Sequence, residues 1–130
     1  MIVISEISNG LLSSNDVLVL VMDMLDIQSH KAHFDSAIRH FGSIDIVFNN
    51  AGRSQRAMWE TIDLDIDKQM FELNVFSVIN LSRIAVNYFN SKGQGQLAVT
   101  SSLAGVQGIP FSATYCGTKH ALHVMILSYF

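Results

Sequence analysis

Tyr115 and Lys119 are the first residues whose types and spacing point to chemistry. They stand four positions apart, so on a helix their side chains share one face and the ammonium can approach the phenol. A nearby positive charge stabilises a phenolate and moves a pKa that is ordinarily about 10 toward neutrality, where the phenol can donate or accept a proton. Taken alone, the pair also fits an ordinary amphipathic helix whose lysine extends its ammonium into water.

Ser102 adds a hydroxyl 13 residues before Tyr115. It follows residues 97–99, a short apolar run with the pattern of a buried strand. A serine at the end of such a strand can polarise a carbonyl oxygen that the tyrosine protonates. Together the three side chains indicate acid–base chemistry on a carbonyl or an alcohol.

Alternating strands and helices are predicted to position these residues. The predicted strands are residues 17–22, 44–48 and 97–99, and the predicted helices are residues 34–41, about 63–90, and 112 to the end of the chain. This alternation is typical of βαβ units, so we expect an α/β fold with a partial Rossmann-like, doubly wound parallel sheet and flanking helices. Ligands bind beyond the carboxyl ends of the strands in such sheets. Asp23, residues 49–52 and residues 101–102 are expected at that edge.

With these positions in place, the sequence resembles the short-chain dehydrogenases/reductases, which transfer hydride between NAD(P)H and a carbonyl or alcohol. The resemblance covers roughly residues 17–125, in the family's order and spacing. The matching positions are Asp23 after the third strand, Asn49-Asn50-Ala51-Gly52 after the fourth, Asn74 in the long helix, Ser102 after the fifth, and Tyr115 with Lys119 in the next helix. Within the family, the sequence is most similar to membrane-associated members of the endoplasmic reticulum that act on retinoid- and steroid-like carbonyls.

The resemblance implies roles for four catalytic residues. Tyr115 would be the general acid in reduction and the general base in oxidation. Lys119 would lower the pKa of that tyrosine and hydrogen-bond the nicotinamide ribose, while Ser102 positions the substrate oxygen. Asn74 would hold a water at a local break in the long helix and connect Lys119 to solvent, although a polar residue that caps a helical irregularity is the alternative interpretation.

The same resemblance implies a nicotinamide cofactor, NADP or NAD, with NADP preferred. Asp23 would contact the adenine ring, and Asn50, Ala51 and Gly52 would let the cofactor lie close to the backbone. Tyr115 and Lys119 belong to this binding set as well. For Asp23 alone, a turn at the end of a strand is the competing interpretation.

One element of the family pattern is missing. The glycine-rich turn that holds a pyrophosphate follows the first strand, whereas Gly93 and Gly95 precede a strand. We therefore expect residues 1–130 to be a single incomplete NAD(P)-binding Rossmann-type domain without the first βαβ unit and the last strands. Insertion of residues 1–7 beside one strand would not replace the two missing strands and the helix between them. The alternative function is a non-catalytic truncated product that pairs with a full-length relative through its last helices. Another parallel α/β fold, such as half of a methyltransferase, leaves the spacing of the three catalytic side chains unexplained.

Composition and charge limit the kinds of fold and partner that the chain can have. The chain has 130 residues, 49% of them hydrophobic and 15% charged, which favours one large apolar interior and disfavours disorder. Its net charge of −3 argues against nucleic acid as the main partner. No apolar run reaches the length of a membrane span, so the chain alone suggests a cytoplasmic protein, whereas the resemblance suggests association with the endoplasmic reticulum membrane. The expected partners are a small carbonyl or alcohol substrate and a second subunit, of the same or another chain, bound through the long helices.

Other suggestive residues carry weaker signals. His30, His33 and His40 lack the spacing of a metal pair, so we expect no metal site. Asn80 begins a glycosylation sequon, but it falls within a buried helical pattern. Cys116 has no histidine in a position to activate it, and we interpret it as a small helical residue.

Overall fold

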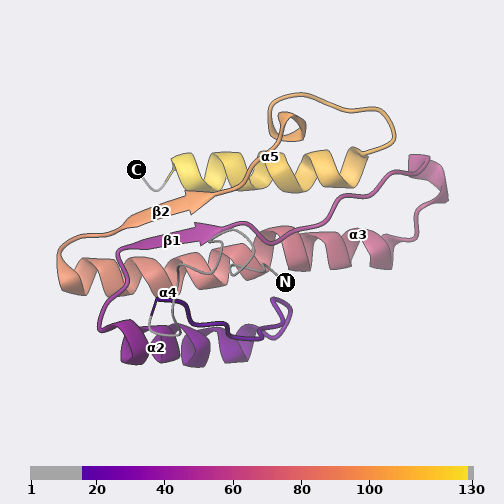
Figure 1. Ribbon diagram of the computed structural model, residues 1–130. Coiled ribbons are helices and arrows are strands. Elements are labelled where there is room, and N and C mark those ends of the chain that lie inside the picture. The colour runs from indigo at the N-terminus through magenta and orange to yellow at the C-terminus, as the bar shows by residue number, and fades with distance from the viewer. Residues whose placement is uncertain (1–15, 129–130) are drawn as a thin grey trace.

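The computed structural model describes residues 16–128. In chain order its elements are the 3-10 turn η1 (Ile27–Ser29), α2 (His30–Phe41), β1 (Ile46–Asn49), the 3-10 turn η2 (Trp59–Thr61), α3 (Leu64–Phe71), the π-helical turn η3 (Glu72–Phe76), α4 (Ser77–Lys92), β2 (Gln96–Val99), the 3-10 turn η4 (Leu103–Gly105) and α5 (Ala113–Leu127). Figure 1 shows α4 and α5 running alongside the two strands. The predicted α/β class is confirmed.

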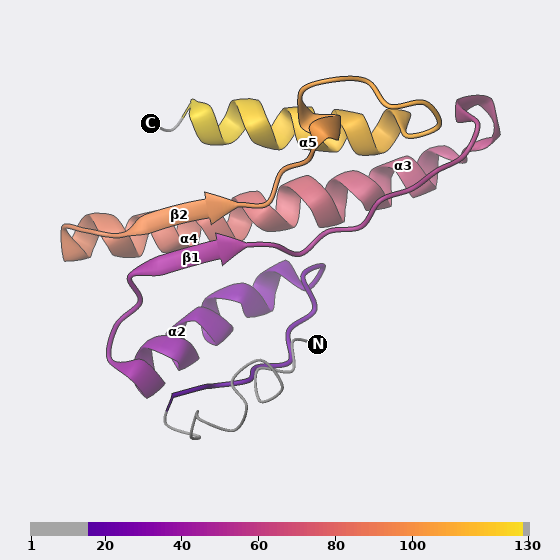
Figure 2. The same cartoon turned by 45° about the horizontal axis from the view of Figure 1, so that its top comes forward.

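The sheet is formed by β1 and β2, which are parallel, with Ile46 opposite Gln96 and Asn49 opposite Val99. The amide of Thr100 donates to the carbonyl of Asn49 at 2.9 Å and extends the pairing by one residue. Neighbouring parallel strands require a crossover connection, and here α3, η3 and α4 supply it. Figure 2 shows both arrowheads pointing the same way, so the residues that follow each strand meet at one edge.

Residues 17–22 do not form the central strand that their β-branched apolar pattern predicts. The structure assigns them no strand, and Val19 and Val21 are 67% and 93% exposed. A parallel strand needs hydrogen bonds to a neighbour and packing on both faces. Within residues 16–128 the sheet contains only β1 and β2, so this run has no strand beside it. Residues 1–7, considered above for insertion beside a strand, lie outside the described residues.

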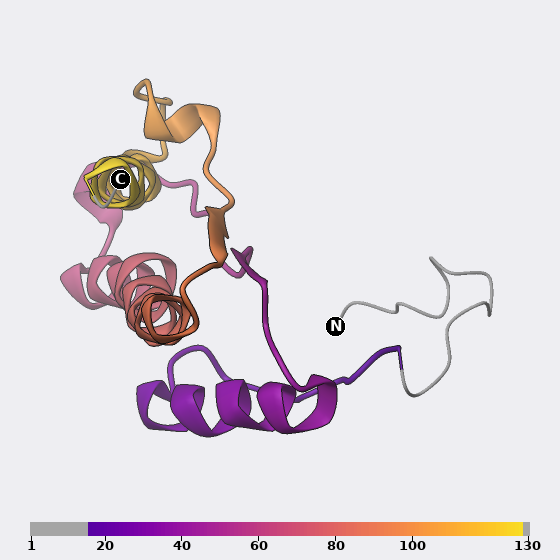
Figure 3. The same ribbon diagram turned by 90° about the vertical axis from the view of Figure 1, so that its left-hand side faces the viewer.

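The helices of the described residues cover one face of the sheet. Figure 3 shows α2, α4 and α5 on the same side of the two strands. A doubly wound sheet carries helices on both faces, but along residues 16–128 the second face has no helix. Ile46 and Phe48 of β1 are accordingly 59% and 63% exposed. The predicted flanking helices are therefore present on one face only.

The helices end and change pitch where the sequence has special residues. α2 stops at Gly42 and α4 stops at Gly93, whose φ angles of 82° and 83° suit glycine. The long helix expected over residues 63–90 is present as α3, η3 and α4 in direct succession, and the π-helical turn is the break around Asn74. The last helix starts after Ser112, as predicted. Of the helices in residues 16–128, none has both the length and the hydropathy needed to cross a bilayer.

Two apolar clusters hold the helices in place. Phe34 packs with Ala85 and Phe89, which joins α2 to α4. Val75, Val78 and Leu122 form the second cluster, which joins η3 and α4 to α5. Full burial of a Val, Leu or Phe side chain contributes about 1.5–3 kcal/mol. The second cluster therefore sets the position of α5, the helix that carries Tyr115 and Lys119.

Candidate active site

Helix α5 places Lys119 beside Tyr115 and against the end of β2. The Nζ atom of Lys119 lies 5.9 Å from the centroid of the Tyr115 ring, a cation–π distance. The same Nζ donates to the carbonyl oxygen of Thr100 at 2.9 Å. Lys119 is only 5% exposed, whereas Tyr115 is half-buried. The ammonium is thus held in one position between the phenol ring and the strand end.

Burial also changes the acidity of Lys119. Desolvation lowers the pKa of its ammonium from the ordinary value, because removal from water disfavours the charged form. A lysine with a lowered pKa gives up a proton more readily than one on the surface. Lys119 thus acts as a hydrogen-bond donor to Thr100, and its place in a proton path stays a prediction.

Asn74 connects the loop after β1 to α5. Its Oδ1 accepts a hydrogen bond from the amide of Arg53 at 3.0 Å, and its Nδ2 donates to the carbonyl of Arg53 at 2.8 Å. The Nδ2 group also donates to Oγ1 of Thr118 at 3.2 Å. The residue is fully buried in the π-helical turn η3. Asn74 therefore lies buried within the helical irregularity and fixes the loop through Arg53 and Thr118. That it caps the irregularity and that it holds a water both stay predictions.

The loop of residues 50–52 passes close to Lys119. A Cβ atom at Gly52 would lie 3.2 Å from Oδ1 of Asn74 and 3.8 Å from Nζ of Lys119. The Oδ1 atom of Asn50 accepts from Oγ1 of Thr100 at 2.7 Å, which ties this loop to the end of β2. Asn50, Ala51 and Gly52 are all exposed. Their backbone can therefore be reached by a ligand lying next to Lys119.

Ser102 lies at the same edge, on the element that packs against α5. It precedes η4, and its Oγ accepts from the amide of Ala104 at 3.2 Å. A Cβ at Gly105 would lie 3.1 Å from the carbonyl oxygen of Lys119, so η4 is in close contact with the backbone of α5. A hydroxyl that accepts one hydrogen bond still has its own proton to donate. Ser102 is half-buried and retains this capacity toward a ligand.

Asp23 lies in a turn before α2. Its Oδ1 accepts from the amide of Leu25 at 3.0 Å, and its carbonyl accepts from the amide of Asp26 at 3.1 Å. In Figure 1 the indigo segment that contains this turn reaches the side toward which the arrowheads of β1 and β2 point. Asp23 is exposed and forms a turn, as the competing interpretation predicts, but within residues 16–22 no strand precedes that turn. Its contact with an adenine ring stays a prediction.

Three residues of this arrangement were not singled out in the sequence. Thr100 accepts the bond from Lys119, and Thr118 and Arg53 complete the contacts of Asn74. Asn49 is 5% exposed, and its Nδ2 donates to Oγ of Ser82 at 3.1 Å. The position of Thr100 between the strand and Ser102 is a signal that could have identified it. The contacts of Arg53 and Thr118, and the bond of Asn49 to Ser82, depend on segments that are distant in sequence.

Two histidines and the cysteine have structural partners. His30 is fully buried between the carbonyl of Met24 and the side chain of Asn80, at 3.1 Å from each. The ring nitrogens of His33 lie 2.9 Å from the carbonyl oxygen of Ser29 and 3.0 Å from that of Val21. Cys116 is buried, and its Sγ accepts from the amide of Ile109 at 3.3 Å. Among residues 16–128 no group of three or more His, Cys, Asp or Glu side chains has the geometry to hold a metal ion.

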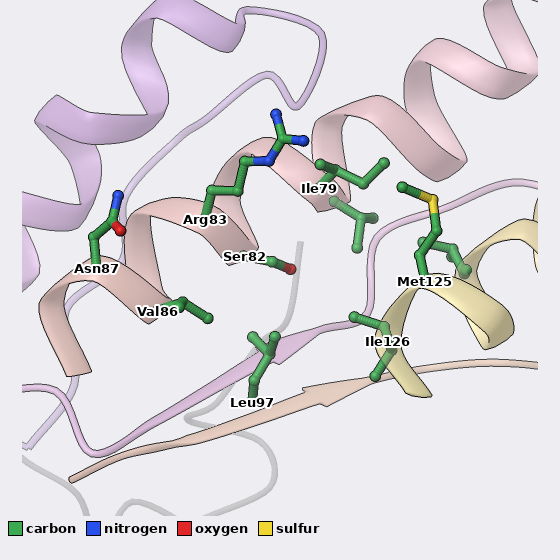
Figure 4. Close-up of a pocket in the computed structure, with 10 residues that line it drawn as sticks. Ile79, Ser82, Arg83, Val86, Asn87, Leu97, Met125 and Ile126 are labelled. Carbon is green, nitrogen blue, oxygen red and sulfur yellow. The ribbon is translucent and has the colours of Figure 1, made fainter. Parts of the chain in front are cut away.

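A separate cavity of about 350 Å³ lies between α4 and α5, away from Tyr115. Figure 4 shows Ser82 and Leu97 toward its interior and Arg83 and Met125 at its sides. Its lining is mostly apolar, and it includes neither Tyr115 nor Lys119. This groove marks a surface of the two long helices that is distinct from the candidate active site.

Comparisons with known proteins agree with this geometry. Residues 3–129 match the sequence profile of the short-chain dehydrogenase family. The chain is 36% identical over 116 residues to "Dehydrogenase/reductase SDR family member 7" of Mus musculus, covering 89% of this chain and 34% of the relative. It is 31% identical to "Uncharacterized oxidoreductase YusZ" of Bacillus subtilis, covering 84% of this chain and 39% of the relative. The chain thus spans about a third of the length of these curated relatives.

Solved structures show the same fold. An NAD+-bound xylitol dehydrogenase matches with a TM-score of 0.78 and 28% identity, covering 82% of this chain and 41% of that one. A short-chain dehydrogenase from Streptomyces avermitilis matches with a TM-score of 0.84 and 23% identity, covering 94% of this chain and 44% of that one. The chain therefore has the Rossmann-like fold predicted from its sequence. Because the family profile matches nearly the whole chain and its tyrosine and lysine meet at the end of β2, this protein belongs to the short-chain dehydrogenase family.

Proposed function

We propose that this protein is an NAD(P)-dependent oxidoreductase that transfers hydride between a nicotinamide cofactor and a carbonyl or alcohol substrate. The observation that carries the proposal is the position of Lys119, whose Nζ is held by the carbonyl of Thr100 beside the Tyr115 ring. Asn74, Ser102, Tyr115 and Lys119 are the proposed catalytic set. Asp23, Asn50, Ala51 and Gly52 are proposed to bind the cofactor together with Tyr115 and Lys119.

The residues near Lys119 fit the nicotinamide-ribose end of such a cofactor. Gly52 has no side chain where a Cβ would crowd Oδ1 of Asn74, and Nζ of Lys119 lies just beyond. The exposed backbone of residues 50–52 therefore leaves room beside a hydrogen-bond donor. The xylitol dehydrogenase that resembles this chain was solved with NAD+ bound, which supports a nicotinamide cofactor. When bound, that cofactor supplies or accepts the hydride.

The side chains of this site would move the accompanying proton. In reduction, Tyr115 gives its phenolic proton to the substrate oxygen while Ser102 donates a hydrogen bond to the same oxygen. The ammonium of Lys119 then stabilises the negative charge that develops on the phenol oxygen. Burial lowers the pKa of Lys119, which eases delivery of a replacement proton from that ammonium. In oxidation each proton moves in the opposite direction.

Cofactor binding is tested first by thermal unfolding with and without NADPH or NADH. A ligand that binds only the folded state at 100 times its Kd stabilises it by about 2.7 kcal/mol. A larger shift with NADPH than with NADH would support the proposed NADP preference. Absence of a shift with either compound would contradict cofactor binding by this chain.

Catalysis is tested by carbonyl-dependent oxidation of NADPH in the Tyr115→Phe variant. We expect turnover to be lost, because the ring remains but the proton donor is removed. Tyr88→Phe is the matched control, because it removes the same hydroxyl from a tyrosine of α4. The hydroxyl of Tyr88 accepts a long hydrogen bond from the amide of Ile44 and is not part of the proposed site. Unchanged turnover in Tyr115→Phe would contradict the assigned role.

A second candidate function is a non-catalytic product that pairs with a longer relative through α4 and α5. The apolar cavity between these helices and the bare face of the sheet support it, because both leave apolar side chains uncovered. Pairing with another copy of this chain through the same helices is part of this proposal. Co-purification with a full-length relative, without saturable cofactor binding, is the expected result. A monomeric chain that binds NADPH saturably would contradict it.

Substrate and location follow from the sequence resemblance. We propose retinoid- or steroid-like carbonyls as substrates and association with the endoplasmic reticulum as the location. Turnover of a steroid ketone and of retinal, each compared with a small polar ketone, tests the substrate class. Fractionation of cells that express the chain tests the location, and recovery solely in the cytosolic fraction would contradict it.

A further inference from the structure

Phe111 has an unusual backbone conformation close to the candidate active site. Its φ angle is 62°, in the left-handed region that bulky residues avoid. It occupies the third position of a turn closed by a hydrogen bond of 3.2 Å from the amide of Ser112 to the carbonyl of Ile109. Pro110 precedes it, and a turn with proline second and a positive φ third favours glycine or asparagine at the third position. The sequence therefore has an aromatic residue where the backbone favours a small one.

Folding does not account for this choice. The Phe111 side chain is 62% exposed, so burial of its ring does not offset the backbone strain. The strain is maintained by its neighbours: the carbonyl of Phe111 accepts from the amide of Ala57 at 2.9 Å, and Ser112 is buried directly before α5. Strain that the surroundings maintain without gain from packing is a mark of functional positions.

The position of Phe111 indicates what that function is. The residue lies four positions before Tyr115, and its turn leads directly into α5. The bond from Ala57 brings a second loop to the same place, and Figures 1 and 2 show the two loops side by side near the start of α5. Met58 and Trp59, which follow Ala57, are 56% and 72% exposed. Two loops thus present large apolar side chains next to the helix that carries the proton donor.

We propose that Phe111 is a specificity-determining residue, whose ring contacts the apolar body of the substrate and favours bulky apolar carbonyls over small polar ones. This inference rests on the proposed function, because it takes Tyr115 as the group that meets the reacting oxygen. An exposed phenyl ring offers apolar surface and no hydrogen-bond partner, so a polyhydroxylated substrate gains little from it. The turn and its bond to Ala57 fix the backbone of Phe111 before substrate arrives, so the loop loses little entropy on binding.

Binding can be tested without turnover, because Trp59 is the single tryptophan of the chain and reports on this place. The saturated bicyclic ketone 2-decalone is titrated while the fluorescence of Trp59 is followed, and dihydroxyacetone serves as the small polar ketone. We expect saturable binding of 2-decalone by the natural chain. Phe111→Asn, which suits the turn, should weaken that binding about fivefold or more at an unchanged or higher Tm. Phe111→Leu, which keeps apolar bulk, should stay within about twofold of the natural chain.

Phe41→Ala is the matched control, because Phe41 is also exposed, at 47%, but lies at the end of α2. It should bind 2-decalone as the natural chain does. The proposal is overturned if Phe111→Asn binds 2-decalone as tightly as the natural chain, whether or not its Tm falls. It is also overturned if the natural chain binds dihydroxyacetone more tightly than 2-decalone, or if 2-decalone gives no saturable signal. A different result would contradict only the proposed hydride transfer. In that case 2-decalone binding depends on Phe111, but NADPH and NADH do not raise the Tm and no turnover is seen.

Discussion

The region from β1 to α5 and the segment of residues 17–26 are stabilised in different ways. The first contains a parallel strand pair, the cluster around Leu122 and the hydrogen bonds of Asn74 and Lys119. The second is joined to α2 by the contacts of His30 and His33 with backbone carbonyls, while Val19 and Val21 are exposed. Both regions contain short β-branched apolar runs. The difference shows that such a run becomes a strand only where a hydrogen-bonding neighbour is present.

Leu122→Ala should produce the largest loss, because it removes a 2% exposed side chain from the cluster that fixes α5. We expect the free energy of unfolding to fall by about 2–5 kcal/mol. The measurement is urea unfolding followed by circular dichroism. Val19→Ala is the control from the other region and should change stability by less than about 0.5 kcal/mol. Equal losses in the two variants would contradict the comparison.

Gly105→Ala tests the contact between η4 and α5. The added Cβ would lie 2.7 Å from Oγ of Ser101 and 3.1 Å from the carbonyl oxygen of Lys119, so one of the two elements must shift. We expect a loss of about 1–3 kcal/mol, measured by the same urea titration. Gly108→Ala is the matched control, since nothing lies within 4 Å of its added Cβ. An unchanged free energy of unfolding in Gly105→Ala would show that η4 can shift without loss of stability.

His33→Phe tests how strongly residues 17–22 are attached. The ring Nε2 lies 3.0 Å from the carbonyl of Val21, and this contact would be lost. The variant also loses the contact of Nδ1 with the carbonyl of Ser29 at 2.9 Å. Each hydrogen bond contributes about 0.5–1.5 kcal/mol, so the global loss should be about 1–3 kcal/mol. Amide exchange at residues 17–22 should accelerate, while the amides of β1 and β2 remain protected. Faster exchange in the strands as well would mean that the two regions unfold as one unit.

Lys119→Met should change the pH dependence of stability more than its value at neutral pH. Burial lowers the pKa of Lys119 in the folded chain, so the cost of burying its charge is fully present below that pKa. This cost disappears as the pH rises from the lowered pKa of the folded chain toward the ordinary pKa of the unfolded chain. In that range the unfolded chain binds more protons than the folded chain, so stability rises with pH. We expect the natural chain to gain stability relative to Lys119→Met between neutral and alkaline pH. Lys31→Met on the exposed face of α2 is the control, and the same slope in all three proteins would contradict the prediction.

Local sequence signals predicted most of the elements correctly. Gly42 and Gly93 end helices because a left-handed residue suits glycine, and Ser112 precedes the last helix. The i, i+4 spacing of Tyr115 and Lys119 was enough to place both on one helix face. The predicted strand at residues 17–22 was wrong, because burial and strand pairing depend on neighbouring segments. The sequence of the run does not show whether those neighbours are present.

The sequence alone determined the family, the order of the helices and of the two strands that form, and the residue types of the site, because helical period, turn residues and spacing are all local. The tertiary structure decided which groups satisfy one another. It joined Lys119 to Thr100 and Asn74 to Arg53 and Thr118, it buried His30, and it strained Phe111 while leaving its ring exposed. The contacts that Lys119 and Asn74 make cross long stretches of chain, and burial depends on every element that packs nearby. A local pattern contains neither kind of information.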